Sequence, residues 1–266
     1  IDGSDHDWFE DRGPRCTLLV FIDDATSQIQ QLLFCHDETT LNYFKALKEY
    51  ILKHGVPRSF YFDKHVVFKV SHSEAKSGNG LTQFGRALNT LNINPIFAHS
   101  PQAKGRVERA NSTLQDRLVK ALLYYNISDI ETANHFTEEF LQQYNHQFAK
   151  PAKYDIDMHR PLEQSEKQNL DIILSFQTKR VISKDMLVRH NSVIYRINEP
   201  AQIRRLKQAP VLVCETISGK IKIYHQEKNL TFEVYRKNLH EDRIFNRSEI
   251  SDYLNLLPRQ LALNKD

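Results

Sequence analysis

Cysteine is scarce in this sequence of 266 residues, and its three cysteines lie far apart, at Cys16, Cys35 and Cys214. No CxxC pair occurs, so the spacing supports neither a zinc site nor a disulfide framework. No apolar run approaches the roughly 20 residues that a membrane-spanning helix needs, and no signal peptide is visible. We therefore expect a protein of a reducing compartment that does not enter a membrane.

A strong excess of charge of one sign is also missing, since 36 Lys and Arg stand against 33 Asp and Glu. The formal net charge of +3 does not by itself indicate a nucleic-acid partner. The hydrophobic share of 40% is ordinary for a globular protein, and the length allows one large or two modest domains. The basic residues are nevertheless clustered, first at Lys104, Arg106 and Arg109 and later at Lys179, Arg180, Lys184 and Arg189.

The stretch 100–118, SPQAKGRVERANSTLQDRL, is the most informative part of the chain. Apolar residues recur at steps of three and four from Val107 onward, which predicts a helix with one buried face. Glu108 lies at the edge of that face, among polar, small and basic neighbours, and Gly105 would let a phosphate backbone approach closely. Its carboxylate either binds a cation or belongs to a solvated helix surface with ordinary charge pairs.

Patterns before this stretch alternate between strand and helix. Runs of β-branched and apolar residues predict strands. Apolar residues at steps of three and four predict helices, and Asp37 is a plausible N-terminal cap of the first helix. A polar segment that contains glycine predicts a mobile loop. This order predicts an α/β layer fold with a mixed sheet. The expected strands are 16–22, 29–35, 59–62 and 94–98, the helices 38–54, 81–91, about 105–126 and 130–148, and the loop 69–80.

The C-terminal part has a different pattern. Residues 151–180 predict a linker with a short helix over 162–174. From Arg180 the apolar period becomes two, and turn signals at Asn191-Ser192, Ser218-Gly219 and Lys228-Asn229 separate about five short strands. We expect a small all-β barrel over 181–240, for DNA binding or assembly, and a tail over 241–266.

Three carboxylates stand out by position: Asp2 in the first strand, Asp63 directly after a strand, and Glu108 near a helix start. Strand ends of an α/β sheet bring such residues together in space, and close carboxylates repel one another unless they share a cation. The simpler interpretation is that Asp2 is a frayed terminal residue and Asp63 a turn residue. Asp23 and Asp24 are read as turn residues, although either could join the site.

Several segments resemble bacterial insertion-sequence transposases of the ISNCY type, which have the integrase core of the retroviral-integrase-like superfamily and an RNase H-like fold. The resemblance covers roughly residues 1–150 and continues more loosely through the predicted barrel. It implies an RNase H-like catalytic core over 1–150, with a five-stranded mixed sheet and flanking helices. The segments are IDGSDHDWFEDRGP, LLVFIDDATS, FYFDKHVVF, TQFGRAL and, most specific, SPQAKGRVERANSTLQDRLVK.

The family uses an Asp, Asp, Glu triad, and the matching positions are Asp2 in IDGS, Asp63 in YFDK and Glu108 in GRVERAN. The resemblance implies that these residues are catalytic and bind two Mg²⁺ or Mn²⁺ ions. The spacing from Asp63 to Glu108 exceeds the family's common spacing, and the loop 69–80 explains the excess. We expect phosphate contacts from basic side chains, or else a solvated charged surface, at Lys64, His65, Lys104, Arg106, Arg109, Lys184 and Arg189.

The function implied is DNA transposition by strand cleavage and strand transfer, on paired ends in a homo-oligomer, in a bacterial cytoplasm at the nucleoid. The alternatives are a nuclease without strand transfer, or a domesticated DNA-binding or assembly protein on the same fold.

The first residue is Ile1, so we expect a fragment or processed chain, and the family's N-terminal helix-turn-helix is not seen. Trp8 and Phe9 either stack on an unpaired base or, as is commoner, pack in the core.

Overall fold

The computed structural model describes residues 1–62, 82–97, 105–154 and 156–235. They form two compact units, Ile1–Lys179 with Pro210–Asn229, and Arg180–Ala209 with the described residues from 230 on. No helix in the described ranges is both long and apolar enough to span a membrane.

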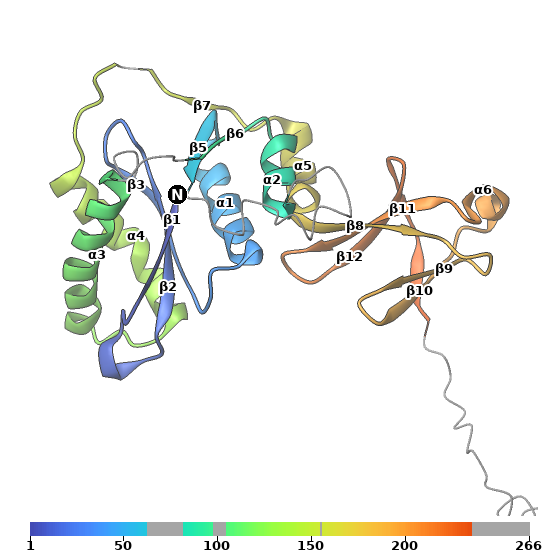
Figure 1. Cartoon of the computed structure of the whole chain (residues 1–266), viewed down its shortest axis with the longest axis horizontal. Helices are drawn as coiled ribbons and strands as arrows, with labels where there is room; N and C mark the ends of the chain where they lie inside the picture. Colours follow the sequence, from blue (N-terminus) through green and yellow to red (C-terminus); the bar gives the residue numbers. More distant parts are fainter. Residues whose placement is uncertain (63–81, 98–104, 155, 236–266) are drawn as a thin grey trace, which may run out of the picture. The chain divides into compact units, whose positions relative to one another are not determined.

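The first unit is a mixed α/β structure, as predicted (Figure 1). The strands in the first 181 residues are β1 (Asp2–His6), β2 (Cys16–Ile22), β3 (Ile29–Cys35), β4 (Val56–Pro57), β5 (Ser59–Phe62), β6 (Asn94–Phe97), β7 (His159–Arg160) and β8 (Ser175–Val181), whose last two residues belong to the second unit. The helices of the first unit are the 3-10 turn η1 (Glu10–Arg12), α1 (Thr40–His54), α2 (Gln83–Thr90), α3 (Gly105–Tyr124), α4 (Ile130–Phe148) and α5 (Gln164–Ile173).

Five strands form the sheet region that positions the candidate site. β1, β2 and β3 pair antiparallel in that order, and β5 pairs with β6 in parallel. The backbone N of Ile1 donates a 2.8 Å hydrogen bond to the carbonyl of Tyr61, so the start of β1 lies beside β5. The five predicted strands are therefore present as an antiparallel and a parallel group.

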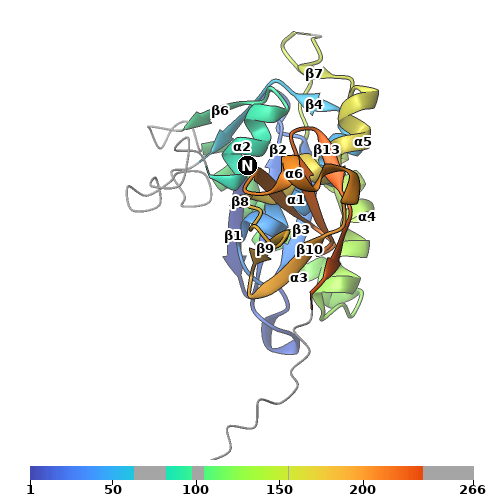
Figure 2. The same cartoon turned by 90° about the vertical axis from the view of Figure 1, so that its right-hand side faces the viewer.

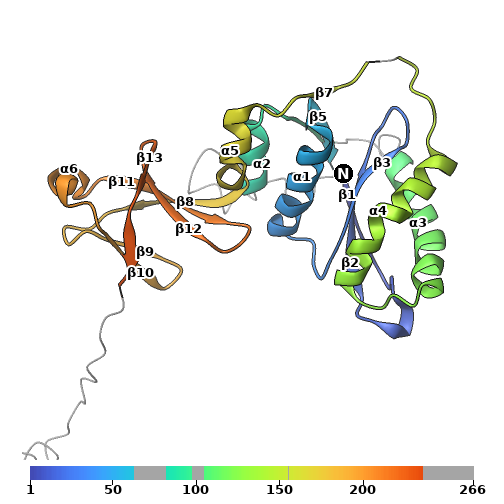
Figure 3. The same cartoon turned by 180° about the vertical axis from the view of Figure 1, so that it is seen from behind.

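Apolar residues of β2 alternate between two cores, which explains its nearly continuous apolar sequence. Leu19 and Phe21 face one core with α1, α2 and α5, whereas Leu18 and Val20 face the other with α3 and α4. Figures 1 and 3 show α1 on one side of the sheet and α3 and α4 on the other. The sheet is thus the middle of three layers, and Trp8 and Phe9 lie fully buried in the second core rather than free to stack on a base.

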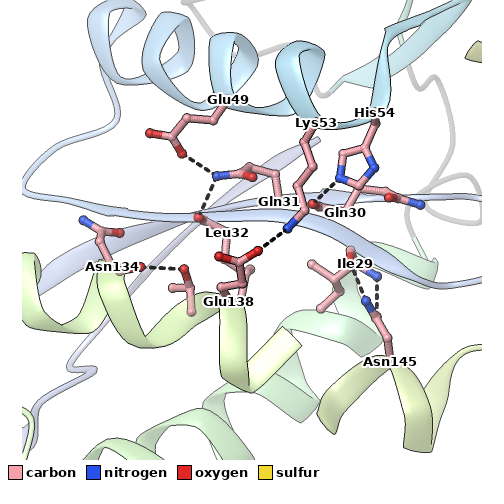
Figure 4. A network of polar contacts seen from close by, with 11 residues as sticks. Ile29, Gln30, Gln31, Leu32, Glu49, Lys53, His54, Asn134, Glu138 and Asn145 are labelled. Carbon is pink, nitrogen blue, oxygen red and sulfur yellow. Dashed lines mark hydrogen bonds and ion pairs between the residues drawn. The ribbon is translucent and has the colours of Figure 1, made fainter. Parts of the chain in front are cut away.

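Side chains of the flanking helices cover the free edge of β3 (Figure 4). Asn145 of α4 accepts from the backbone N of Ile29 and donates to its carbonyl, both at 2.8 Å. Asn134, three turns earlier, does the same for Phe34 at 2.7 and 3.0 Å. An uncovered edge strand invites pairing with another chain, so these two asparagines complete β3 without another strand.

The ends of α1 are set by local chemistry that the sequence pattern only partly predicted. The cap is Thr39, whose hydroxyl accepts from the backbone N of Asn42, and not Asp37. A β-region Thr directly before the first helical residue fits the N-cap role, which Asp37 is too far upstream to fill. The helix ends at Gly55, which has φ +87° and leaves no room for a Cβ beside the carbonyl of Arg160.

The predicted barrel is not observed as such. In the described residues, β8 belongs to a four-stranded sheet with β11 (Pro210–Thr216), β12 (Ile221–His225) and β13 (Lys228–Leu230), whereas β9 (Leu187–His190), β10 (Val193–Ile197) and β14 (Phe232–Val234) form a separate three-stranded sheet. Pro200 opens the 3-10 turn η4 (Pro200–Gln202), which leads into α6 (Ile203–Leu206), so β10 does not continue into a hairpin with β11. Lys228 and Asn229 lie in β13, and not in a turn.

Candidate active site

A hydrogen bond between β1 and α3 defines the centre of the candidate site. Asn111 Nδ2 donates to Asp2 Oδ2 at 2.9 Å. Farther along the same two elements, Gln115 Nε2 donates to Ser4 Oγ at 3.2 Å. Asp2 and Ser4 point to one face of β1, since side chains alternate along a strand, and that face lies against α3.

Glu108 belongs to the row of α3 that faces β1. It precedes Asn111 by three residues and Gln115 by seven, and these spacings place side chains on one face of a helix. Glu108 is exposed and lies in the first turn, whereas the next turns bury Ala110 and Leu114. The carboxylate of Glu108 therefore emerges at the end of α3 where Asn111 meets Asp2.

Another carboxylate approaches β1 from its second face. Glu38 Oε1 accepts a 2.7 Å hydrogen bond from the hydroxyl of Tyr43, which is fully buried. A Cβ on Gly3 would lie 2.5 Å from Glu38 Oε2, so only glycine fits there without moving that carboxylate. Burial, and then the negative charges of Glu38 and Asp2, raise the pKa of Tyr43 and keep its hydroxyl a donor. No sequence pattern had indicated Glu38 as a site residue.

The predicted DNA contacts that are described are all exposed. Arg106 forms an ion pair with Asp24, at 3.5 Å between Nη1 and Oδ1, which joins α3 to the β2–β3 turn. Arg109, three residues farther along α3, is exposed at the same end of the helix. In the other unit, Lys184 and Arg189 are exposed as well, and the carbonyl of Arg189 accepts from Arg180 Nε at 3.0 Å.

Four predicted site residues lie outside the described residues, as does the loop 69–80: Asp63, Lys64, His65 and Lys104. Within the described ranges, no three His, Cys, Asp or Glu side chains are grouped closely enough to hold a metal ion. Asn111 Oδ1 is buried and has no hydrogen-bond partner among the described residues. The carboxylates of Asp2 and Glu108 with this amide oxygen are an all-oxygen donor set, which suits a hard divalent cation.

A cavity of about 530 Å³ opens beside Asp2. Its wall includes Ile1, Asp2 of β1, Tyr61 of β5 and Arg106 of α3. Asp23 and Asp24 also line it. The Asp23 carboxylate is held in a turn by the backbone N and hydroxyl of Thr26, which confirms the turn interpretation of Asp23.

Residues between α4 and β7, together with His159 of β7, also line this cavity. We call residues 153, 154 and 156–159 the strap; it lies near the top of the view in Figure 1, and Lys153, Tyr154, Ile156, Met158 and His159 line the cavity. The sequence had indicated only a linker here. The strap was missed because its residues carry no periodic pattern, and its position depends on contacts with distant elements.

Several hydrogen bonds hold the end of the strap. β7 pairs with β4, as Figure 2 shows near α5, and the backbone N of Arg58 donates to the carbonyl of Met158 at 3.0 Å. The imidazole of His159 lies 2.6 Å from the hydroxyl of Tyr50 and 2.7 Å from Asp157 Oδ1. The hydrogen bonds from His159 lower the pKa of the Asp157 carboxyl.

With this geometry in view, comparison with known proteins gives two clear relatives. The chain is similar to bacterial transposases. It is 42% identical over 239 residues, 90% of its length, to "Putative transposase y4bF" of Sinorhizobium fredii. It is 33% identical over 252 residues, 91% of its length, to "Transposase for insertion sequence IS1202" of Streptococcus pneumoniae. The chain spans about half the length of these curated relatives, 52% and 53% respectively.

No family model matches the chain. Among solved structures, one similar chain comes from the cryo-EM structure of the simian T-cell lymphotropic virus intasome in complex with PP2A regulatory subunit B56 gamma. The two are 16% identical with a TM-score of 0.44, over 88% of this chain and 74% of that one. This likeness is too distant to indicate a function.

Proposed function

We propose that this chain is the catalytic region of an insertion-sequence transposase, which cuts DNA and joins the cut end to a second DNA. The observation that carries the proposal is the hydrogen bond from Asn111 to Asp2, because it brings one predicted catalytic carboxylate to the helix end that holds Glu108. The two similar bacterial proteins, both named as transposases, support it. The finer assignment, to the ISNCY type with an RNase H-like integrase core, rests on the motif around Glu108.

The reaction proposed is phosphoryl transfer in two steps. Water attacks a phosphodiester at the end of the element, which breaks one P–O bond and frees a 3′-hydroxyl. That hydroxyl then attacks a phosphodiester of the target DNA, so that a new P–O bond joins the element to the target while the target's own P–O bond breaks and releases a target 3′-hydroxyl. No side chain forms a covalent bond to DNA. Asp2, held by Asn111, acts together with Asp63 and Glu108, and their oxygens would hold two Mg²⁺ or Mn²⁺ ions. Such ions, when bound, stabilise the charge that develops on the attacking and leaving oxygens.

DNA is the proposed partner at both steps. The exposed side chains of Arg106 and Arg109 lie at the same end of α3 as Glu108, where phosphate contacts would position a strand without reading its sequence. Lys184 and Arg189 would add contacts from the second unit. We propose a homo-oligomer on paired ends, in a bacterial cytoplasm at the nucleoid, because the reaction joins two DNA ends to one target.

The test is a cleavage and joining assay with DNA that carries the element's ends and a separate target duplex, with Mg²⁺ or Mn²⁺. The expected products are a nicked end with a 3′-hydroxyl and a joined DNA. Cleavage without joining under every condition would favour a nuclease, and DNA binding with neither product would favour a domesticated binding protein. An Asp2→Asn protein should lose both products and still bind DNA.

A further inference from the structure

We propose that the cavity beside Asp2 binds the base of an unpaired nucleotide next to the phosphodiester that is cut. This inference rests on the proposed function, since it names what the neighbouring strand does while Asp2 and Glu108 act. The volume of the cavity, about 530 Å³, lies within the range of pockets that bind small ligands. One wall carries Asp2, so a nucleotide in the cavity would adjoin the reacting phosphate.

Large apolar side chains are exposed in this cavity to a degree that core packing does not explain. Tyr61 is 46% exposed and Tyr154 is 67% exposed, and they line the cavity from two different elements, β5 and the strap. Ile156 and Met158 of the strap line it too and are more than half exposed. An aromatic ring with a free face is the group on which an unpaired base stacks, whatever the base.

Cationic side chains accompany these rings. Arg58, Arg106 and Lys153 line the cavity and are exposed, and the ammonium of Lys153 lies 5.3 Å from the centre of the Tyr154 ring. Arg106 is paired with Asp24, whose carboxylate also lines the cavity. The wall therefore combines aromatic faces for a base with the side chains of Arg58 and Lys153, which can contact the phosphates beside it.

The strap is held in a way that keeps the cavity open before DNA arrives. Its end is fixed by the pairing of β7 with β4 and by the contact of His159 with Tyr50. Gly55 allows this close approach, because the Arg160 carbonyl oxygen lies only 2.7 Å from where a Cβ would be. A wall fixed in this way need not be ordered when the base enters, which favours binding.

The experiment uses the full chain and a short duplex whose single-stranded overhang carries 2-aminopurine, a fluorescent base that is quenched when it stacks. Wild-type protein should quench the probe, and quenching should persist in Asp2→Asn protein, which cannot cut. The double variant Tyr61→Ala, Tyr154→Ala should abolish quenching and weaken overhang binding roughly tenfold, while binding of a blunt duplex stays unchanged. Tyr154→Trp should preserve quenching.

The matched control is Tyr124→Ala, since Tyr124 is 82% exposed at the end of α3 and does not line the cavity. It should behave as wild type. Equal quenching by the double variant, with its circular dichroism and melting temperature unchanged, would overturn the assignment of the cavity. Absence of quenching by the wild type, despite binding to blunt duplex, would overturn it as well and leave the proposed function standing. Absence of all DNA binding would overturn both the assignment of the cavity and the proposed function.

Discussion

Asn111 donates its hydrogen bond to Asp2 across 109 positions of sequence, from the second turn of α3 to the first residue of β1. An amide donor at 2.9 Å fixes the orientation of the carboxylate that accepts from it. Asn111 is therefore a positioning residue for Asp2.

Replacing Asn111→Ala should lower cleavage by about 10- to 100-fold, the usual effect of losing a group that orients a ligand carboxylate. DNA affinity should stay unchanged, and the Mn²⁺ concentration needed for half-maximal cleavage should rise. Thr113→Ala is the control, because its hydroxyl bonds the helix backbone at Arg109 and the side chain of Tyr144, and not Asp2. A rate loss that is independent of metal concentration would argue for a purely structural role of Asn111.

Glu108→Gln should reduce cleavage by orders of magnitude while the fold and DNA binding persist. The change keeps side-chain size and helix propensity nearly constant but removes a negative charge and a strong oxygen ligand. Glu131→Gln is the matched control, since Glu131 lies in the first turn of α4 and outside the candidate site. Cleavage is measured on end-containing DNA with Mg²⁺ and with Mn²⁺, and near-normal rates for Glu108→Gln would remove this residue from the site.

Asn134→Ala and Asn145→Ala should each lower the free energy of unfolding by about 1–3 kcal/mol, because a backbone donor and acceptor of β3 then lose their partner. The double variant should also aggregate, since it exposes the edge of β3. Urea unfolding and light scattering measure the two effects. Asn169→Ala should be near neutral, because Asn169 is exposed and bonds within its own helix; equal losses in all three variants would contradict the edge-covering role.

The attachment of the strap should weaken in acid. Arg160 binds Glu166 through two hydrogen bonds of 2.7 and 2.6 Å, which lower the pKa of Glu166 below its ordinary value of 4.5. A depressed carboxyl pKa stabilises the folded state above the ordinary pKa, and this stabilisation is lost as pH falls through the lower, folded value. We therefore expect no change in this contribution between pH 7 and about pH 5, and a loss below about pH 4.

Glu166→Gln tests this expectation. It should lower the melting temperature at pH 7 and reduce the difference from wild type as the pH falls below about 4. Glu139→Gln, an exposed change on α4, should leave the melting temperature unchanged. A constant difference between Glu166→Gln and wild type across the whole pH range would show that the charge of Glu166 is not the source of the stabilisation.

Local pattern was sufficient for most elements of the first unit. The run Cys16–Ile22 and the strand Ile29–Cys35 have the predicted bounds, as does the helix Ile130–Phe148 with Asp129 as its cap. These elements are long, or bounded by strong turn and cap residues, so neighbours in sequence decide them. The hydrophobic spacing also fixed which face of α3 is buried, and hence that Glu108 lies at its edge.

Tertiary structure decided what no local pattern contains. The pairing of Asn111 with Asp2, the placement of Glu38 against Gly3 and the strap beside Tyr61 each join segments that are distant in sequence or lack periodicity. The predicted barrel was wrong for the same reason, because strand partners depend on how 198–209 folds between β10 and β11. The sequence determined which residue types are available at each strand end and helix turn, whereas long-range packing decided which of them meet, since that depends on the relative placement of whole elements.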